Sequence, residues 1–245
     1  MLKLSRAVCP ELKEFESLAS TNGFLTSQDL ASLKDFSAVV SFSQTAGQGR
    51  LGRSWVSEPG ASISLSLLLK AEATPAELSW LTLMAAASVR ETVGELTGSS
   101  ALIKWPNDVL VNERKISGIL AELTPHGVIL GIGVNLKRQS TAPEQAISLE
   151  ELASKASFDE VLAVLLTQLR ARYLKFLTSP AWAIKDLQSE IRQFSATIGK
   201  KVRAIYPDQK ELIGLAVDID SNGNLLVESD GIHAVSAADI IHLRN

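Results

Sequence analysis

Two segments of this 245-residue chain place positively charged side chains beside glycine or proline, a combination suited to holding an anion. The first is Gly47-Gln48-Gly49-Arg50-Leu51-Gly52-Arg53-Ser54. Its glycines let backbone N–H groups approach a ligand, and its arginines offer forked donors to phosphate. The second is Lys104-Trp105-Pro106-Asn107-Asp108, where a lysine ends an apolar stretch just before a rigid turn. Together they predict a local anion-binding site.

The glycine segment matches the dinucleotide pattern G-x-G-x-x-G and, if Arg53 replaces lysine, the phosphate-loop pattern. Both patterns work only between a strand and a following helix, whose N-terminus meets the phosphate. Residues 38–42 predict a strand, but residues 63–69 alternate between apolar and small polar side chains, which predicts a second strand. Neither pattern has its helix. The segment is therefore predicted to be a long, mobile, cationic loop between two strands.

Simpler interpretations exist for the other candidates. Lys104 could extend from a sheet edge to solvent, as lysines commonly do. Trp105 is a packing residue by type. Ser20 and Thr21 could cap a helix predicted over residues 25–33.

Composition excludes several function classes. The formal net charge is −3, so no global basic field favours nucleic acid. One cysteine rules out a disulfide within the chain, and three dispersed histidines make a Cys/His zinc site unfavourable; no metal-ligating residues are assigned. Neither a signal peptide nor an apolar stretch of membrane-spanning length is present, so the expected location is the cytoplasm.

The remaining pattern predicts an α+β protein. A helix follows Pro75 and ends at Gly98, strands are expected over 101–105, 109–111, 116–123 and 128–136, and residues 11–18 suggest a short helix or irregular segment. Ser157 and Glu160 form a capping box for a helix over 158–177, and another helix is expected over 181–194. Short strand-like runs then cover 201–205, 211–218, 224–228 and 234–243. We expect a mixed, mostly antiparallel sheet with flanking helices in residues 1–195 and a small barrel in residues 196–245.

Four motifs resemble those of the biotin protein ligases in order and spacing: residues 47–55, Lys104-Trp105-Pro106-Asn107-Asp108, Lys115-Ile116-Ser117-Gly118 and Gly131-Ile132-Gly133-Val134-Asn135. Ser20-Thr21-Asn22 resembles that family's biotin contact, and the resemblance extends from about residue 18 to the C-terminus. It implies a catalytic core related to class II aminoacyl-tRNA synthetases, followed by an SH3-like β-barrel. Only 19 residues precede Ser20, so we expect the form without an N-terminal DNA-binding domain.

The resemblance also implies a reaction. Biotin and ATP are the substrates, Mg²⁺ is expected with ATP, and the product biotinyl-5′-AMP passes biotin to a lysine of a biotin carboxyl carrier domain of a biotin-dependent carboxylase. Neither DNA nor membrane is an expected partner. A weak or ligand-dependent homodimer is compatible with the family.

By the same resemblance, Lys104 and Arg50 are the catalytic residues. The biotin-binding residues are Ser20, Thr21, Asn22, Gln44, Gln48, Gly49, Arg50, Lys104 and Gly118. The adenylate- and ATP-binding residues are Arg50, Arg53, Trp55, Asn107, Lys115 and Asn135. Gln48 departs from the family, which usually has arginine there, and Arg244 is either an ATP contact or a solvated terminal charge.

Two rival functions remain. A lipoate or octanoate ligase or transferase would share the core, but the Lys104 turn and the arginine segment argue against it. A non-catalytic biotin-binding protein would not need Lys104, Arg50 and Arg53, because biotin alone brings no phosphate.

Overall fold

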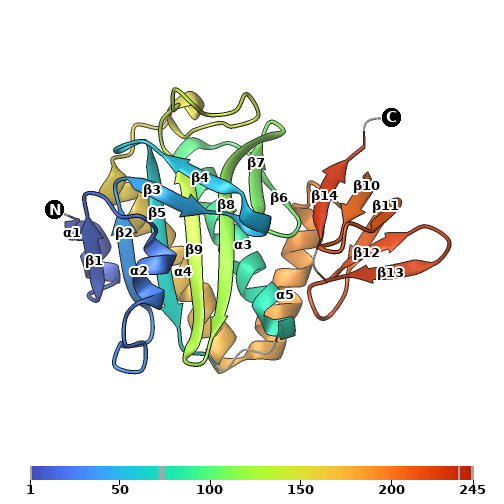
Figure 1. The fold of residues 1–245 in the computed structure, drawn as a ribbon, viewed down its shortest axis with the longest axis horizontal. Helices are drawn as coiled ribbons and strands as arrows, with labels where there is room; N and C mark the ends of the chain where they lie inside the picture. Colours follow the sequence, from blue (N-terminus) through green and yellow to red (C-terminus); the bar gives the residue numbers. More distant parts are fainter. Residues whose placement is uncertain (1, 72–74, 237, 244–245) are drawn as a thin grey trace.

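The computed structural model describes residues 2–71, 75–236 and 238–243. Its centre is a seven-stranded sheet (Figure 1). The strand order is β1 (Leu12–Phe15), β2 (Ser37–Ser41), β5 (Ser62–Leu69), β9 (Gly127–Asn135), β8 (Arg114–Thr124), β7 (Asp108–Val111) and β6 (Ala101–Lys104). Every neighbouring pair is antiparallel except β1 and β2, which run parallel. The sheet is therefore mixed and mostly antiparallel, as expected.

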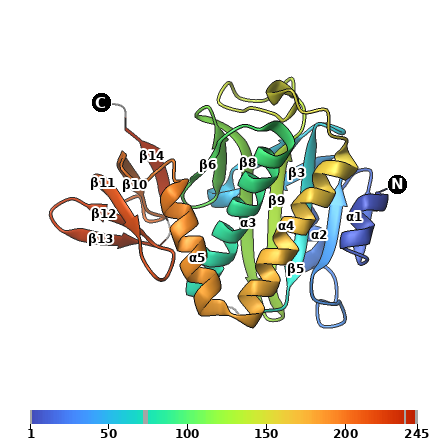
Figure 2. The ribbon, with the colours of Figure 1, turned by 180° about the vertical axis from the view of Figure 1, so that it is seen from behind.

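Helices cover one face of this sheet. The helices α3 (Pro75–Thr97), α4 (Phe158–Thr178) and α5 (Pro180–Gln193) lie together on this face, in front of the strands in the view of Figure 2. The short α1 (Lys3–Val8) packs against α4. Ser157 and Glu160 form the predicted capping box, which satisfies two backbone donors at the start of α4. All eight residues of β5 are buried because the strand is covered on both faces.

The opposite face carries α2 (Thr21–Thr26) and a hairpin of β3 (Gln44–Gln48) and β4 (Ser54–Ser57), joined by a 3₁₀ turn over Arg50–Gly52 (Figure 1). The segment predicted as a long, mobile, cationic loop does connect two strands, β2 and β5, but it contains this hairpin, whose two arms pair through the backbone. The prediction of a helix over 25–33 was wrong. The observed helix, α2, begins at Thr21 and ends at Thr26, because the Ser20 Oγ caps it by accepting from the backbone N of Gly23 at 3.2 Å.

The prediction for residues 11–18 was wrong as well, because they contain β1. Leu12 is buried and pairs with Ala38 of β2. Four residues are too few to establish a period of two in the sequence, so the strand is stabilised by its neighbour rather than by its own pattern.

The C-terminal part forms a five-stranded antiparallel sheet beside the helices (Figure 1). Its order is β13 (Ile232–Val235), β12 (Leu225–Glu228), β11 (Glu211–Ile219), β10 (Lys201–Ile205) and β14 (Asp239–His242). The run expected over 234–243 is thus two strands. Among the described residues, β13 and β14 share no ladder.

Two tryptophans fasten this sheet to the larger part. The Trp80 indole of α3 donates to the backbone oxygen of Ser221 at 2.8 Å, and the Trp105 indole donates to that of Gly223 at 2.9 Å. Gly223 has φ +77°, which glycine adopts without strain. No helix in the described part of the chain is long and apolar enough to cross a membrane.

Candidate active site

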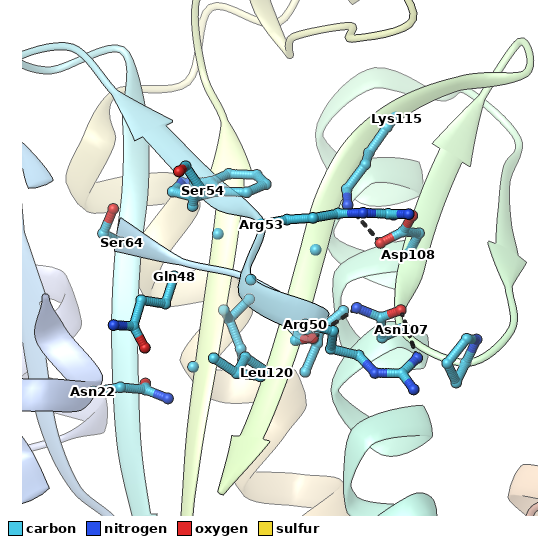
Figure 3. Close-up of a pocket in the computed structure, with 18 of the residues that line it drawn as sticks. Asn22, Gln48, Arg50, Arg53, Ser54, Ser64, Asn107, Asp108, Lys115 and Leu120 are labelled. Carbon is cyan, nitrogen blue, oxygen red and sulfur yellow. Dashed lines mark hydrogen bonds and ion pairs between the residues drawn. The ribbon is translucent and has the colours of Figure 1, made fainter. Parts of the chain in front are cut away.

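One cavity lies between the β3–β4 hairpin and the seven-stranded sheet, and Figure 3 shows its lining. Its walls come from the start of α2, the hairpin, β5, β8, β9, the turn after β6, and β14 of the C-terminal sheet. Thirteen predicted site residues line it: Ser20, Thr21, Asn22, Gln44, Gln48, Gly49, Arg50, Arg53, Trp55, Lys104, Asn107, Lys115 and Gly118. Segments from Ser20 to Ile240 in sequence thus meet at one point.

One end of the cavity is polar but neutral. Gln44 Oε1 accepts from the backbone N of Thr21 at 2.7 Å and lies 3.1 Å from its hydroxyl. Ser66 Oγ lies 2.7 Å from Thr21 Oγ1 and 2.5 Å from Asn22 Oδ1. Ser20 both caps α2 and lines the cavity. Thr21, Asn22 and Ser66 are buried and Ser20 and Gln44 half-buried, and together they offer hydrogen bonds without net charge, as a small uncharged ring requires.

The other end is cationic (Figure 3). Arg50 donates to Asn107 Oδ1 at 3.4 Å, and burial lowers the pKa of Arg50, while the charges of Asp108 and Asp239 oppose that shift. Arg53 forms an ion pair with Asp239, and Lys115 Nζ lies 2.6 Å from Asp108 Oδ1. Four cationic side chains, with Lys104, converge here.

Lys104 is the last residue of β6 and is opposite Asp108 in the strand pairing. It is partly buried and lines the cavity, so it is not a residue that only extends to solvent. Within the described ranges, no carboxylate forms an ion pair with it. Its charge is therefore directed at the cavity without a compensating anion. Trp105 beside it is buried as packing, with its backbone N donating to Thr197 Oγ1 at 3.1 Å.

Glycines on β8 and β9 make room for the lining side chains. A Cβ on Gly131 would lie 2.4 Å from Asn22 Oδ1, and one on Gly133 would lie 2.3 Å from Trp55 Cε2. A Cβ on Gly118 would lie 3.0 Å from Lys115 Nζ. All three glycines occupy paired strand positions, so close packing, not a turn, explains them. The Trp55 indole Nε1 is buried and finds no hydrogen-bond partner among the described residues.

Two predicted residues stand apart. Asn135 is not among the cavity-lining residues; its Nδ2 donates to the backbone oxygens of Lys115 at 3.2 Å and Ile147 at 3.0 Å. That amide holds the segment after β9 against β8. Its assignment to ATP stays a prediction. Arg244 lies outside the described residues.

The structure also brings in residues that the sequence did not single out. Asp239 and Ile240 reach the cavity from the C-terminal sheet, and no local signal marked them. Ser64 lines the cavity, and Ser66 joins its neutral end. Their alternation with Ile63, Leu65 and Leu67 was visible, and it places both serines on the same face of β5. Asp108 was visible within its motif but carried no assigned role.

Comparison with known proteins gives a consistent result. Residues 14–137 match the Biotin/lipoate A/B protein ligase family, and residues 197–243 match the Biotin protein ligase C terminal domain. The biotin–[acetyl-CoA-carboxylase] ligase of Mycobacterium tuberculosis is 36% identical over 237 residues, which cover 92% of this chain and 86% of that protein. The bifunctional ligase/repressor BirA of Escherichia coli is 32% identical over 222 residues, covering 87% of this chain and 68% of that protein. A biotin protein ligase from Aquifex aeolicus, solved in complex with biotin and ATP, superposes with a TM-score of 0.80 at 29% identity, covering 96% of this chain and 99% of that one.

Proposed function

The chain belongs to the biotin protein ligase family, and from this premise we propose how this cavity serves both half-reactions. The enzyme uses ATP to convert biotin to biotinyl-5′-AMP, and then transfers biotin to a lysine. The observation that carries the proposal is the division of the cavity into a neutral polar end and a cationic end (Figure 3). Biotin has the matching division, with an uncharged ureido ring and a carboxylate at the end of its chain.

We assign the ureido ring to the end formed by Thr21, Asn22 and Gln44. Its carbonyl needs donors and its N–H groups need acceptors, and these side chains supply both. The carboxylate then points toward Lys104. Gln48 lies on β3 where the family usually has arginine, and its neutral amide can still donate to a ligand.

In the first half-reaction, a biotin carboxylate oxygen attacks the α-phosphorus of ATP, and the bond to pyrophosphate breaks. Two anions must approach each other, and negative charge grows on the phosphoryl oxygens. Lys104 can lie between carboxylate and phosphate as a compact charge. Arg50 and Arg53 can bind the phosphates with forked donors, with Arg53 exchanging Asp239 for phosphate.

The adenine and ribose would lie toward Trp55, Asn107 and Lys115. The unpaired Trp55 Nε1 supports this assignment, because a buried indole donor without a partner suits a ligand acceptor. The described residues contain no cluster of three or more His, Cys, Asp or Glu side chains placed to hold a metal ion. We propose that Mg²⁺ is held mainly by the ATP phosphates, with Asp108 and Asp239 as the carboxylates that line the cationic end.

In the second half-reaction, the lysine amine of a carrier domain attacks the acyl carbon, and AMP leaves. Until then water must be kept from the mixed anhydride. The β3–β4 hairpin lies over the cavity, and ordering of its arginines on the adenylate would close it. We propose residues 1–195 as the catalytic domain and residues 196–245 as the domain that adds Asp239 and Ile240. The acceptor is a biotin carboxyl carrier domain, and the use of ATP supports a cytoplasmic location.

Isotope exchange between pyrophosphate and ATP tests the proposal directly. The purified chain should support exchange with biotin, and not with lipoate or without an acid. Exchange with lipoate would favour the lipoate ligase alternative. Biotin binding without any exchange would favour a non-catalytic binder.

A further inference from the structure

A carboxylate outside the cavity contacts its neutral end. Glu122 on β8 accepts a hydrogen bond from Asn22 Nδ2 at 2.7 Å. It lines an adjoining cavity, which shares Gln48, Gly49 and Arg50 with the first, and its hydrogen bond to Asn22 connects it to the neutral end. We propose that Glu122 is a positioning residue that fixes the direction of the hydrogen bonds presented to the ureido ring. The inference rests on the proposed function, which assigns this end of the cavity to biotin.

The direction follows from which groups can donate. A carboxylate oxygen accepts hydrogen bonds and has no proton to give. The Asn22 amide nitrogen must therefore face Glu122, and its Oδ1 must face Ser66. Because Oδ1 carries no proton, the Ser66 hydroxyl donates to it across 2.5 Å.

The consequence passes to Thr21. The Ser66 hydroxyl has a single proton, which it donates to Asn22, so it can only accept from Thr21. The Thr21 proton therefore goes either to Ser66, at 2.7 Å, or to Gln44 Oε1, at 3.1 Å. In both cases the Thr21 proton is used inside the network. Its remaining lone pair faces the ligand as an acceptor, which is what a ureido N–H needs.

Without Glu122, this order can reverse. The Asn22 amide could turn over and present Nδ2 to Ser66, which would then accept instead of donate. Relocation of the whole side chain is restricted, because Asn22 packs directly on Gly131, where even a Cβ would approach Oδ1 to 2.4 Å. Reversal of the amide is thus the change we expect when Glu122 is lost.

A charge-swap experiment tests the direction. Asn22→Asp alone sets two carboxylates against each other and should weaken biotin binding at least about thirtyfold. In the double variant with Glu122→Gln, the glutamine amide donates to the introduced carboxylate and Ser66 still donates to it. The double variant should therefore bind biotin about tenfold or more tighter than Asn22→Asp alone. Glu122→Gln alone should weaken biotin binding at most about threefold, because its amide oxygen can still accept a hydrogen bond. Glu122→Met, which cannot accept one, should weaken biotin binding about tenfold. Glu228→Met, at an exposed carboxylate on β12, is the matched control and should stay within about twofold of the parent.

Biotin affinity is measured by calorimetry, with the KM for ATP and thermal unfolding as checks that each variant is folded. The ATP KM should change little, because the effect is confined to the neutral end. Failure of Glu122→Gln to restore binding to the Asn22→Asp chain, or normal biotin affinity in folded Glu122→Met, would overturn the proposal. A parent chain that binds biotin without pyrophosphate exchange would refute the enzymatic function, and the charge swap would still test the role of Glu122 through biotin affinity. A parent that does not bind biotin would refute both.

Discussion

At the scale of single residues, the cations of the cavity differ in how far they are already neutralised. Arg53 and Lys115 each face a carboxylate. Among the described residues, Arg50 has a hydrogen bond to the neutral amide of Asn107 and feels Asp108 and Asp239 only through their charge, and no carboxylate forms an ion pair with Lys104. Arg50 and Lys104 therefore keep most of their charge for a substrate. This distribution supports their assignment to the carboxylate and the α-phosphate.

Lys104→Gln should keep the fold and lose the first half-reaction. The amide retains some donor capacity but no charge, and removal of one preorganised electrostatic group typically costs about 10²–10³ in rate. Pyrophosphate exchange should fall by about that factor. Transfer from chemically supplied biotinyl-adenylate should fall much less, since its anions are already joined.

Lys155→Gln is the control for that change, because Lys155 is exposed and remote from the cavity lining. It should leave both half-reactions intact. If Lys104→Gln supports exchange at the parent rate, Lys104 has no part in adenylation.

At the scale of elements, β9 supports both ends of the cavity. Its Gly131 accommodates Asn22, and two residues further along the same face its Gly133 accommodates Trp55. Alternate residues of a strand lie on one face, so Gly131 and Gly133 both face the cavity. The strand β9 thus sets the depth of the cavity under the ureido ring and under the nucleotide.

Alanine at these two positions should separate the substrates. Gly131→Ala should displace Asn22 and raise the KM for biotin, and Gly133→Ala should displace Trp55 and raise the KM for ATP. Each effect should be about tenfold or more, because overpacking at such contacts typically costs about 1–3 kcal/mol. Gly231→Ala is the control, since a Cβ there meets nothing within 4 Å. Equal effects of both variants on both substrates would contradict the assignment of the two ends.

The start of α4 gives a prediction on stability alone. Ser157 Oγ accepts from the backbone N of Glu160, and the Glu160 carboxylate accepts from the backbone N of Ser157 at 2.7 Å. Ser157→Ala should lower the free energy of unfolding by about 1 kcal/mol, measured by denaturant titration, with catalysis unchanged. Ser189→Ala within α5 lacks a capping role and should change stability by less than about 0.5 kcal/mol.

At the scale of the whole molecule, the C-terminal sheet is joined to the catalytic site by a short chain of hydrogen bonds. His242 Nε2 lies 3.2 Å from Thr197 Oγ1, which accepts from the backbone N of Trp105, next to Lys104. Burial lowers the pKa of His242 below its ordinary 6.5, and the positive charges of Lys104 and Lys200 act in the same direction. The folded protein therefore favours the neutral ring.

A pH dependence of stability follows. The unfolded chain takes up a proton on His242 near pH 6.5, and the folded chain does so only at lower pH. Between these two values the unfolded state binds more protons, so stability is full above 6.5 and decreases as the pH falls below it. Thermal unfolding between about pH 5 and 8 should show this slope, above the range in which carboxylates titrate. His242→Gln should flatten the slope, and His126→Gln, at an exposed turn residue, should not. If the slope is unchanged in His242→Gln, the pH dependence of stability comes from other groups.

The sequence by itself determined the local patterns and the chemistry. Helical spacing and caps predicted α3 and α4, alternation predicted most strands, and the resemblance to the biotin protein ligases identified thirteen of the residues that line the cavity. Each of these signals lies within a short run of neighbouring residues. Only the tertiary structure decided that residues 11–18 contain a strand, that the arginine segment forms a hairpin, and that Asp239 and Glu122 reach the site. Each of these depends on backbone pairing or a contact with a partner distant in the chain, so its stabilisation comes from packing that no local pattern records.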